Sequence, residues 1–426
     1  MAEEAVAQIF AAAAMARRNG DRAEELRLLE SILEQSPENP QALNALGMAA
    51  LAAPDPARAA ALFARAAAQD PGESALWMNL ATAERALGND EGEREGLNRA
   101  LAADQLNFMA HLRLAELQQR TGEAAAAARS WQNVLMMAAG IDPMPPALAE
   151  TLDDARRFVA GQMTDFASFI DSGMAEGLDT LPATDRRRMR ATLDHMLGRR
   201  QIYRNECSGL HVPFLPADEF FDRAHFPWLA QIEARSDAIR REFLALFEGK
   251  GADAIRPYVR QESGTPDNKW SPLDGSLDWG ACFLWEYGVP NDVVCALCPE
   301  TAAALAMVPR NDIPGRAPTA FFSLLRPHTR IPPHTGVTNS RAIIHLPLIV
   351  PGQCGFRVGG ETRAWKVGEA FAFDDTIEHE AWNDSDELRV VLIFDVWNPH
   401  LSPAEQQMLT QFFEIADRSG HNPGMK

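Results

Sequence analysis

The stretch Arg341-Ala-Ile-Ile-His-Leu-Pro-Leu-Ile-Val350 alternates between two kinds of side chain, and this period of two indicates a β-strand. A second stretch, Leu388-Arg-Val-Val-Leu-Ile-Phe-Asp-Val-Trp397, has the same pattern. In each of them one face is wholly apolar, whereas the other carries polar groups, namely His345 in the first and Arg389 and Asp395 in the second. Such groups are costly on a buried strand unless their face lines a wet cavity or a ligand. We therefore expect both strands to border a site.

Further short strands are expected around this pair. Phe356-Arg-Val-Gly-Gly-Glu-Thr-Arg-Ala-Trp365 is typical of a hairpin, with Gly359 and Gly360 supplying the positive φ values of its turn. Glu369-Ala-Phe-Ala-Phe-Asp-Asp375 is another short strand. Helices are expected over 232–247 and 404–417. Many short strands with few helices favour a closed or sandwich-like β unit.

Two histidines stand in short polar motifs beside these strands. The first is in Pro333-His334-Thr335-Gly336 and the second in Glu378-His379-Glu380. Imidazole suits Fe(II), and the guanidinium of Arg389 can hold a carboxylate with two parallel hydrogen bonds. Two histidines followed by an arginine are therefore what a mononuclear iron centre with a 2-oxoacid co-substrate requires.

This iron hypothesis has weak points in the residues themselves. The usual site adds an aspartate two positions after the first histidine, where this chain has Gly336. Asp374 or Asp375 could supply a carboxylate from the opposite side of a turn. Arg389 could instead form a structural ion pair with Asp395, because both lie on one strand face. His345 could be an ordinary satisfied polar residue.

Taken together, these motifs resemble the aspartyl/asparaginyl β-hydroxylase family over about residues 206–400. That family consists of Fe(II)/2-oxoglutarate dioxygenases on a double-stranded β-helix, a cupin-like jelly roll. Its members hold iron with two histidines only, and a glycine stands in the position of the carboxylate, so Gly336 fits the family. We expect Gly336→Asp to be tolerated or to alter iron affinity, without restoring anything lost. The motifs that carry the resemblance are Ser323, His334-Thr335-Gly336, Thr338-Asn339, Arg341, His345-Leu346, Phe373-Asp374-Asp375, Glu378-His379-Glu380, Trp382, Arg389 and Asp395-Val396-Trp397.

The resemblance implies roles for individual residues. It makes His334 and His379 the iron ligands, and it implies no catalytic residue beyond this metal centre. The remaining roles are Ser323 and Arg389 at the distal carboxylate of 2-oxoglutarate, His345 at the carboxylate next to its ketone, and Arg341 and Trp285 at the substrate. Two departures leave the substrate open: Ile343 stands where animal members have a second arginine, and Trp285-Glu286-Tyr287-Gly288 keeps only part of a W-Q-Q-G substrate wall.

The N-terminal third has a different pattern, which repeats at about 34 residues, the period of tetratricopeptide repeats. Glycines recur in the expected turns between helices at Gly20, Gly88 and Gly122, with Pro54 in the remaining slot. The sequence predicts a tetratricopeptide α-solenoid, in which stacked helix pairs bury what one pair cannot bury alone. Such arrays usually offer a groove to a peptide or protein partner. The residues that recur in register include Leu43, Leu46-Gly47, Ala59, Phe63, Ala66, Pro71, Trp77, Leu80-Ala81, Leu97, Ala100, His111, Leu114-Ala115, Ala127 and Trp131.

Charge and cysteine usage exclude some partners. Lys+Arg 40 against Asp+Glu 59 gives a net charge of −19, which disfavours nucleic acid and anionic membrane surfaces. No apolar run reaches membrane-spanning length, and Met1-Ala-Glu-Glu does not resemble a signal peptide. The five cysteines include one C-x-x-C, Cys295 to Cys298, without the second pair that a zinc site needs. We expect buried thiols and a cytoplasmic protein.

The sequence thus predicts a multidomain α plus β chain. Its parts are a tetratricopeptide domain over 1–142, a helical connector over 143–205 and an oxygenase domain over 206–426. The expected activity is hydroxylation of the β-carbon of Asp or Asn in a peptide or protein, with Fe(II), 2-oxoglutarate and O2. One alternative is the same chemistry on a small molecule, a lipid acyl chain or a carrier-bound amino acid. The other is a tetratricopeptide adaptor whose oxygenase domain is inactive.

Overall fold

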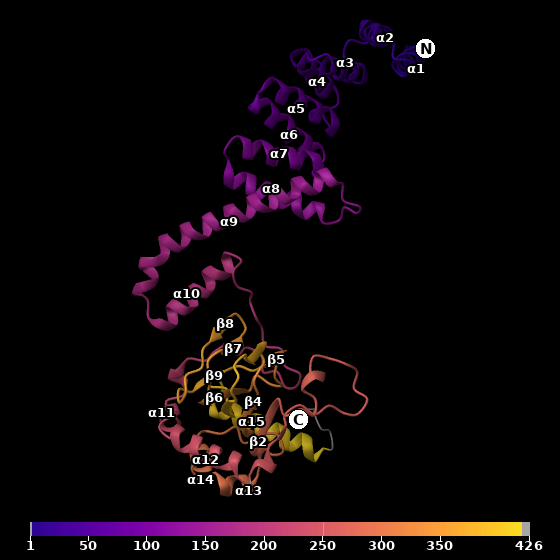
Figure 1. Cartoon of the computed structure of the whole chain (residues 1–426). Coiled ribbons are helices and arrows are strands. Elements are labelled where there is room, and N and C mark those ends of the chain that lie inside the picture. The colour runs from indigo at the N-terminus through magenta and orange to yellow at the C-terminus, as the bar shows by residue number, and fades with distance from the viewer. Residues whose placement is uncertain (1, 250, 420–426) are drawn as a thin grey trace. The chain divides into compact units, whose positions relative to one another are not determined.

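The computed structural model describes residues 2–249 and 251–419, and its contacts divide the chain into two compact units. The first is Met1–Gly177 and the second is Leu178–Lys426. The boundary lies near the C-terminal end of helix α9 (Pro146–Thr180), inside the segment expected to be a connector. Figure 1 shows helices alone in the first unit and strands with flanking helices in the second. The coarse expectation of a helical unit followed by a β unit is confirmed.

The first unit begins with four helix pairs. The second helices of the pairs start at residues 22, 56, 90 and 124, so the period predicted from the sequence is confirmed by the helix starts. The helices are α1 (Ala2–Arg18), α2 (Arg22–Gln35), α3 (Pro40–Ala52), α4 (Pro56–Gln69), α5 (Ser74–Leu87), α6 (Asp90–Ala103), α7 (Phe108–Arg120) and α8 (Ala124–Ala138).

Helix-capping residues explain where the second helices of the first three pairs begin. Asp21, Asp55 and Asn89 precede α2, α4 and α6, and each side-chain oxygen accepts a hydrogen bond from a backbone N–H in the first turn. Gly20 and Gly88 have φ values of 76° and 72°, which suit glycine at the tight turn between helices. In the first and third pairs, a glycine after the first helix is thus followed at once by the capping residue of the second helix.

Apolar side chains inside and between the pairs form the core of this unit. Leu43 and Leu46 on α3 are buried with Ile32 of α2 and Leu76 of α5. A Cβ on Gly47 would press into the Phe63 ring, so glycine is what lets α3 approach α4. Each pair leaves apolar surface that only its neighbours cover, as expected of stacked repeats.

The second unit contains two antiparallel sheets. The larger is ordered β1-β2-β4-β11-β6-β9, with β3 paired to β2, and the smaller is ordered β5-β10-β7-β8. The strands are β1 (Arg256–Pro257), β2 (Trp279–Glu286), β3 (Val289–Pro290), β4 (Ala320–Leu325), β5 (Thr329–His334), β6 (Arg341–Ile349), β7 (Cys354–Val358), β8 (Glu361–Arg363), β9 (Phe371–Phe373), β10 (His379–Asn383) and β11 (Arg389–Trp397).

Helices pack on one face of the larger sheet. Leu346 of β6 and Leu392 of β11 pack there with Phe243 of α12 and Leu305 of α14, in one buried cluster. The expected helix over 232–247 is interrupted, since α11 ends at Glu233 and α12 starts at Ser236. The helices of this unit are α10 (Ala183–Met196), α11 (Leu229–Glu233), α12 (Ser236–Glu248), α13 (Asp292–Leu297), α14 (Pro299–Ala306) and α15 (Pro403–Arg418), with short 3-10 turns at Arg223–His225, Ala252–Ala254 and Ser271–Leu273.

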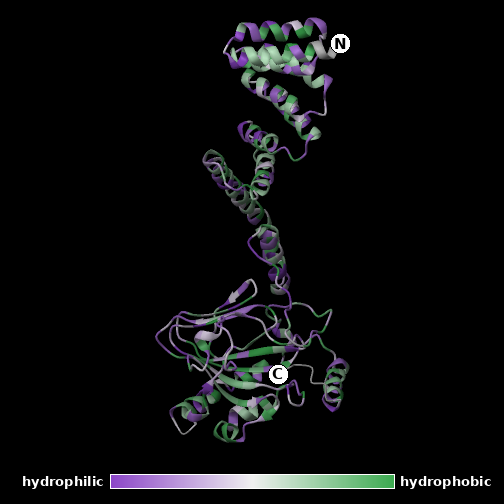
Figure 2. Cartoon of the chain, turned by 90° about the vertical axis from the view of Figure 1, so that its right-hand side faces the viewer, coloured by the Kyte–Doolittle hydropathy of each residue, from purple (hydrophilic) through white to green (hydrophobic). Residues whose placement is uncertain are grey.

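The other face of the larger sheet looks toward the smaller sheet. Ile343 of β6 and Val391 of β11 lie in a second buried cluster with Phe356 of β7 and Ala381 of β10. The predicted alternation of β6 and β11 is therefore confirmed, and the polar face is the one between the sheets. Figure 2 shows the long strands of this unit as mainly hydrophobic, which fits strands covered on both faces.

The predicted hairpin is confirmed as β7 paired with β8. Val358 is opposite Glu361, and Gly359 between them has a φ of 53°. The predicted positive φ at Gly360 is wrong, because the turn uses that region at Gly359 and not at Gly360. The five cysteines are all free, and Cys282 and Cys298 are buried. Within the described residues no helix is both long enough and apolar enough to cross a membrane.

Candidate active site

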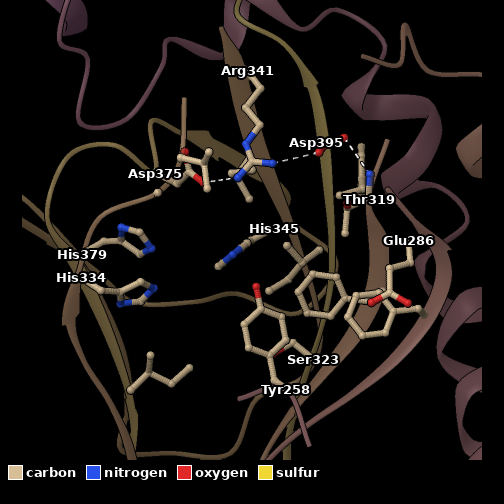
Figure 3. Close-up of a pocket in the computed structure, with 18 of the residues that line it drawn as sticks. Tyr258, Glu286, Thr319, Ser323, His334, Arg341, His345, Asp375, His379 and Asp395 are labelled. Atoms are coloured by element: carbon tan, nitrogen blue, oxygen red, sulfur yellow. Dashed lines mark hydrogen bonds and ion pairs between the residues drawn. The ribbon is translucent and has the colours of Figure 1, made fainter. Parts of the chain in front are cut away.

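The two predicted metal ligands lie side by side on the smaller sheet. His334 ends β5 and His379 begins β10, and these two strands pair so that the histidines are direct partners in the register. Their ring centroids are 4.1 Å apart, and both rings border a cavity of about 660 Å³ (Figure 3). Pairing of two strands far apart in the sequence thus places both imidazoles at one point.

Backbone contacts fix how each imidazole presents itself. Nδ1 of His334 lies 2.8 Å from the carbonyl oxygen of Pro332, and Nδ1 of His379 lies 3.0 Å from that of Ile377. A carbonyl can only accept, so each Nδ1 carries the proton and each Nε2 keeps its lone pair. Orientation of a ligand histidine by such a contact is usual at metal sites.

Burial keeps both imidazoles neutral. Burial, together with the neighbouring His379, lowers the pKa of His334 to about 3. Burial also lowers the pKa of His379 to about 4. Neutral imidazole is the form that binds a metal ion, so neither histidine has to lose a proton first at neutral pH.

The carboxylate nearest to this pair comes from Asp375, in the turn before β10. A Cβ on Gly336 would overlap the Asp375 carboxyl group, so that group fills the space beside Gly336. Asp374 is turned away and accepts hydrogen bonds from Thr376 and Asn205. Within the described residues no group of three or more His, Cys, Asp or Glu side chains is placed to hold a metal ion. Two imidazoles are therefore what this site offers.

Ser323, His345 and Arg389 line the same cavity from the larger sheet. Ser323 is on β4, and its Oγ accepts a hydrogen bond from Trp279 Nε1 at 3.2 Å, which leaves the hydroxyl proton for another acceptor. Nδ1 of His345 is buried and has no hydrogen-bond partner among the described residues. Burial lowers the pKa of His345 well below its usual value.

Arg389 is the most unusual member of this group. It is 1% exposed, and among the described residues its Nε and Nη2 atoms have no hydrogen-bond partner. Its guanidinium lies 4.6 Å from the Trp365 ring, and burial lowers its pKa to about 9. Burying a cation without a partner destabilises the folded protein, so such a cation is expected only where the carboxylate of a ligand pairs with it. Together with Ser323 and His345, it fits a small dicarboxylate such as 2-oxoglutarate.

The alternative pairing of Arg389 with Asp395 is wrong. Asp395 accepts from the backbone N–H of Thr319 at 3.0 Å and from Arg341 Nη1 at 3.3 Å. Burial, partly offset by Arg341, raises the pKa of Asp395 to about 6. The two residues share a strand face but are six positions apart, so a partner on the neighbouring strand β6 reaches Asp395 instead.

Arg341 lines the cavity, but protein carboxylates already hold it. Its Nη2 is 2.8 Å from Asp375, and its Nη1 is the partner of Asp395 (Figure 3). Although burial lowers the pKa of Arg341, the two carboxylates raise it overall. The sequence predicted a contact to a substrate carboxylate, and the structure shows a guanidinium that is already paired twice.

Trp285 is the predicted site residue that the described cavity lining does not include. Its ring packs against the helix-side cluster, with the Arg310 guanidinium 6.0 Å away. The pairing of β2 with β4 shifts between Phe283 and Trp285, and such a bulge turns the next side chain to the other face. Glu286 and Tyr287 line the cavity in its place.

The sequence did not predict an aromatic group on the cavity wall that faces Arg341. Tyr258, Phe283 and Phe321 line the cavity, and Figure 3 shows the Tyr258 side chain directed into it. Tyr258 is 40% exposed. The sequence shows aromatic residues in β2 and β4, but no local pattern places Tyr258 beside these strands.

Comparison with known proteins shows what part of the second unit is similar to. Residues 233–399 match the model of the aspartyl/asparaginyl beta-hydroxylase family. This part of the second unit is therefore similar to that family. The predicted resemblance is thus confirmed, and the hydroxylase-like segment contains both histidines, Arg341, His345 and Arg389.

Individual relatives agree over parts of their length. The chain is 38% identical over 134 residues to the mouse aspartyl/asparaginyl beta-hydroxylase, covering 31% of this chain and 18% of that protein. It is 34% identical over 192 residues to the ornithine lipid ester-linked acyl 2-hydroxylase of Rhizobium tropici, covering 43% and 62%. The aligned part thus spans less than two thirds of each relative. Among solved structures, MamA covers 42% of this chain and 98% of its own, at 15% identity and a TM-score of 0.34, which is too low to support an argument.

Proposed function

We propose that this chain is an Fe(II)- and 2-oxoglutarate-dependent dioxygenase that hydroxylates a carbon atom. The observation that carries the proposal is the pair of neutral imidazoles, each held through Nδ1 by a backbone carbonyl, in one cavity with the buried guanidinium of Arg389. Two nitrogens of that guanidinium have no hydrogen-bond partner among the described residues. The two facing antiparallel sheets are consistent with the double-stranded β-helix that such enzymes use. An adaptor with an inactive domain would have no need to keep Arg389 in so costly a position.

The residues would divide the work as follows. His334 and His379 would hold the metal through Nε2. Arg389 and Ser323 would receive the distal carboxylate of 2-oxoglutarate, and His345 the carboxylate beside its ketone. Bound iron, 2-oxoglutarate and O2 would supply the oxidation, in which one oxygen atom would go to the substrate carbon and the other to succinate with loss of CO2. The apolar residues around the site keep water away from this chemistry.

Two substrate classes are candidates, since the aligned part spans only a fraction of each relative. The first is the β-carbon of Asp or Asn in a peptide or protein, suggested by the family's name and by a repeat unit of the kind that binds peptides. The second is an acyl chain or another small substrate, suggested by the Rhizobium relative. The twice-paired Arg341 favours the second class. The five free cysteines suit a cytoplasmic enzyme.

A binding experiment tests the proposal without knowledge of the substrate. The full chain is titrated with Fe(II) and 2-oxoglutarate in the absence of oxygen, and the metal-to-ligand absorption band of the complex is followed. We expect saturable binding that is lost in His334→Ala and in His379→Ala. His328→Ala is the matched control, because His328 is exposed and contacts Asp386. Wild-type iron binding and succinate formation by His379→Ala would rule out the iron assignment.

A further inference from the structure

One side of the cavity is a continuous surface of aromatic rings that starts at the histidines. The Trp270 ring is 5.0 Å from the His334 ring, and the Trp279 ring is 6.3 Å from it. Tyr258 stacks on Trp279 with ring centroids 4.0 Å apart. Phe321 is 5.3 Å from Tyr258. These rings give the inner part of the cavity an apolar wall.

The same wall continues away from the histidines. Phe283 stacks on Phe321 with ring centroids 5.0 Å apart and an interplanar angle of 29°. At its far end the Arg256 guanidinium lies 4.6 Å over the Phe283 ring and pairs with Glu286. We call these five rings the aromatic wall: Trp270, Trp279, Tyr258, Phe321 and Phe283.

On the opposite side of the cavity, the guanidinium of Arg341 is already paired with two carboxylates. Figure 3 shows the Arg341, Asp375 and Asp395 group across the cavity from Tyr258. One guanidinium faces two carboxylates there, at 2.8 and 3.3 Å, so the group is negative when both are ionised. A substrate carboxylate brought to this side would meet net repulsion rather than a free cation.

The other arginines that line the cavity are poorly placed to bind a substrate carboxylate at the histidines. Arg256 pairs with Glu286, and Arg316 makes two contacts of 2.7 Å with Asp417. Arg260 is exposed to solvent. Arg389 is left for the co-substrate under the proposed function. Ile343, on the face that carries His345, adds another apolar side chain to the lining.

We infer that the substrate group brought to the two histidines is an uncharged hydrocarbon group, an aliphatic or aromatic side chain or an acyl chain, lying along the aromatic wall. This inference rests on the proposed function and specifies its substrate class. A carboxylate side chain would lose part of its hydration in this cavity. The cation beside His334, Lys269, donates to the backbone carbonyl of Pro333 at 2.7 Å and lies outside the described cavity lining. A hydrocarbon group gains from burial against five rings.

Three probes of similar shape test the inference. They are N-acetyl-L-leucinamide, N-acetyl-L-asparaginamide and the α-amide of N-acetyl-L-aspartic acid, which differ only in the end of a branched side chain. Each is titrated into the full chain with Fe(II) and 2-oxoglutarate in the absence of oxygen. Binding is followed by tryptophan fluorescence, since two rings of the wall are tryptophans. We expect the leucine probe to bind about ten-fold more tightly than the aspartate probe.

Substitutions in the aromatic wall test whether it causes the preference for the leucine probe. Tyr258→Ala and Phe283→Ala should each weaken the leucine probe by about five-fold, whereas Leu277→Ala, exposed and outside the described cavity lining, should not. Ile343→Arg should strengthen the aspartate probe by adding a guanidinium beside His345. Because Ile343 is buried, the melting curve of that variant is recorded as well, and Phe283→Lys provides a second added cation at a partly exposed position.

The outcomes separate this inference from the proposed function. An aspartate probe that binds as tightly as the leucine probe would overturn the inference, and so would leucine binding that is insensitive to both alanine variants. The iron and 2-oxoglutarate absorption band is recorded before each titration. If that band is absent, the proposed function fails, and the same probe series on the metal-free chain still decides the inference.

Discussion

The backbone N–H of Gly336 donates a hydrogen bond to the backbone carbonyl of Asp375 at 2.5 Å, and a Cβ on Gly336 would overlap the Asp375 side chain. The space that an aspartate would need at position 336 is thus filled by a carboxylate from a different loop. Arg341 holds that carboxylate in place. Of the two outcomes expected for Gly336→Asp, tolerance is contradicted, because two carboxyl groups would compete for one space. Altered iron affinity stays a prediction.

Gly336→Ala should lower the free energy of unfolding by about 1–3 kcal/mol, the usual cost of forcing a group into a packed site. Asp375 is short and paired, so it cannot move aside cheaply. Urea denaturation measures the change. Gly352→Ala is the control, because a Cβ there meets nothing within 4 Å. Equal effects of the two substitutions would contradict the close contact between Gly336 and Asp375.

Arg389→Ala should weaken 2-oxoglutarate binding by about 2–5 kcal/mol, or roughly thirty-fold to several thousand-fold. Arg389→Lys should recover only part of this affinity, since an ammonium lacks the planar fork. Titration of 2-oxoglutarate into the Fe(II) protein without oxygen measures both variants. The surface substitution Arg330→Ala, which removes a contact to Asp384, is the control.

The stability of the same variants separates a ligand site from a structural ion pair. No carboxylate is paired with Arg389 among the described residues, so Arg389→Ala should not destabilise the protein through a lost salt bridge. Unchanged 2-oxoglutarate affinity in a destabilised Arg389→Ala protein would contradict the assigned role.

Asp395 should make stability depend on pH between about 4 and 7. Burial raises its folded-state pKa to about 6 from 3.8, so the folded protein binds a proton there that the unfolded chain releases. Its contribution is therefore most favourable at low pH and is lost as pH rises through 6, by up to about 3 kcal/mol. Asp395→Asn should remove this dependence.

The measurement is the difference in free energy of unfolding between wild type and Asp395→Asn, at several pH values. That difference should shift against the wild type as pH rises. Asp253→Asn removes a charge from an exposed position and should leave the wild-type pH profile unchanged. A difference that moves in the wild type's favour with rising pH would contradict burial as the dominant cause.

The fragment Leu178–Lys426 should fold without the helical repeats and keep Fe(II) and 2-oxoglutarate binding, because its clusters of buried residues are its own. Circular dichroism and a cooperative melting transition check folding, and the absorption titration checks binding. The full chain serves as the reference for both. A fragment that binds neither ligand, or that melts without cooperativity, would show that the repeats are required for the structure of the site.

The sequence by itself determined the local elements of this protein and the residue types of its site. The period of the repeats, the caps at Asp21 and Asp55 and the alternation in β6 and β11 depend on neighbours within a few positions, so local rules predict them. The order of His334, His379 and Arg389 likewise predicts an iron site with a carboxylate ligand.

Only the tertiary structure decided which side chains meet. A bulge in β2 turns Trp285 out of the cavity. Two carboxylates, one from a loop and one from a strand, pair with Arg341. Tyr258 packs against rings that are distant in the chain. Each of these outcomes depends on strand register and on contacts between segments far apart in sequence, where a shift of one residue reverses the face that a side chain presents. The substrate side of the cavity is built from such contacts, whereas both histidines could be recognised from their own short motifs.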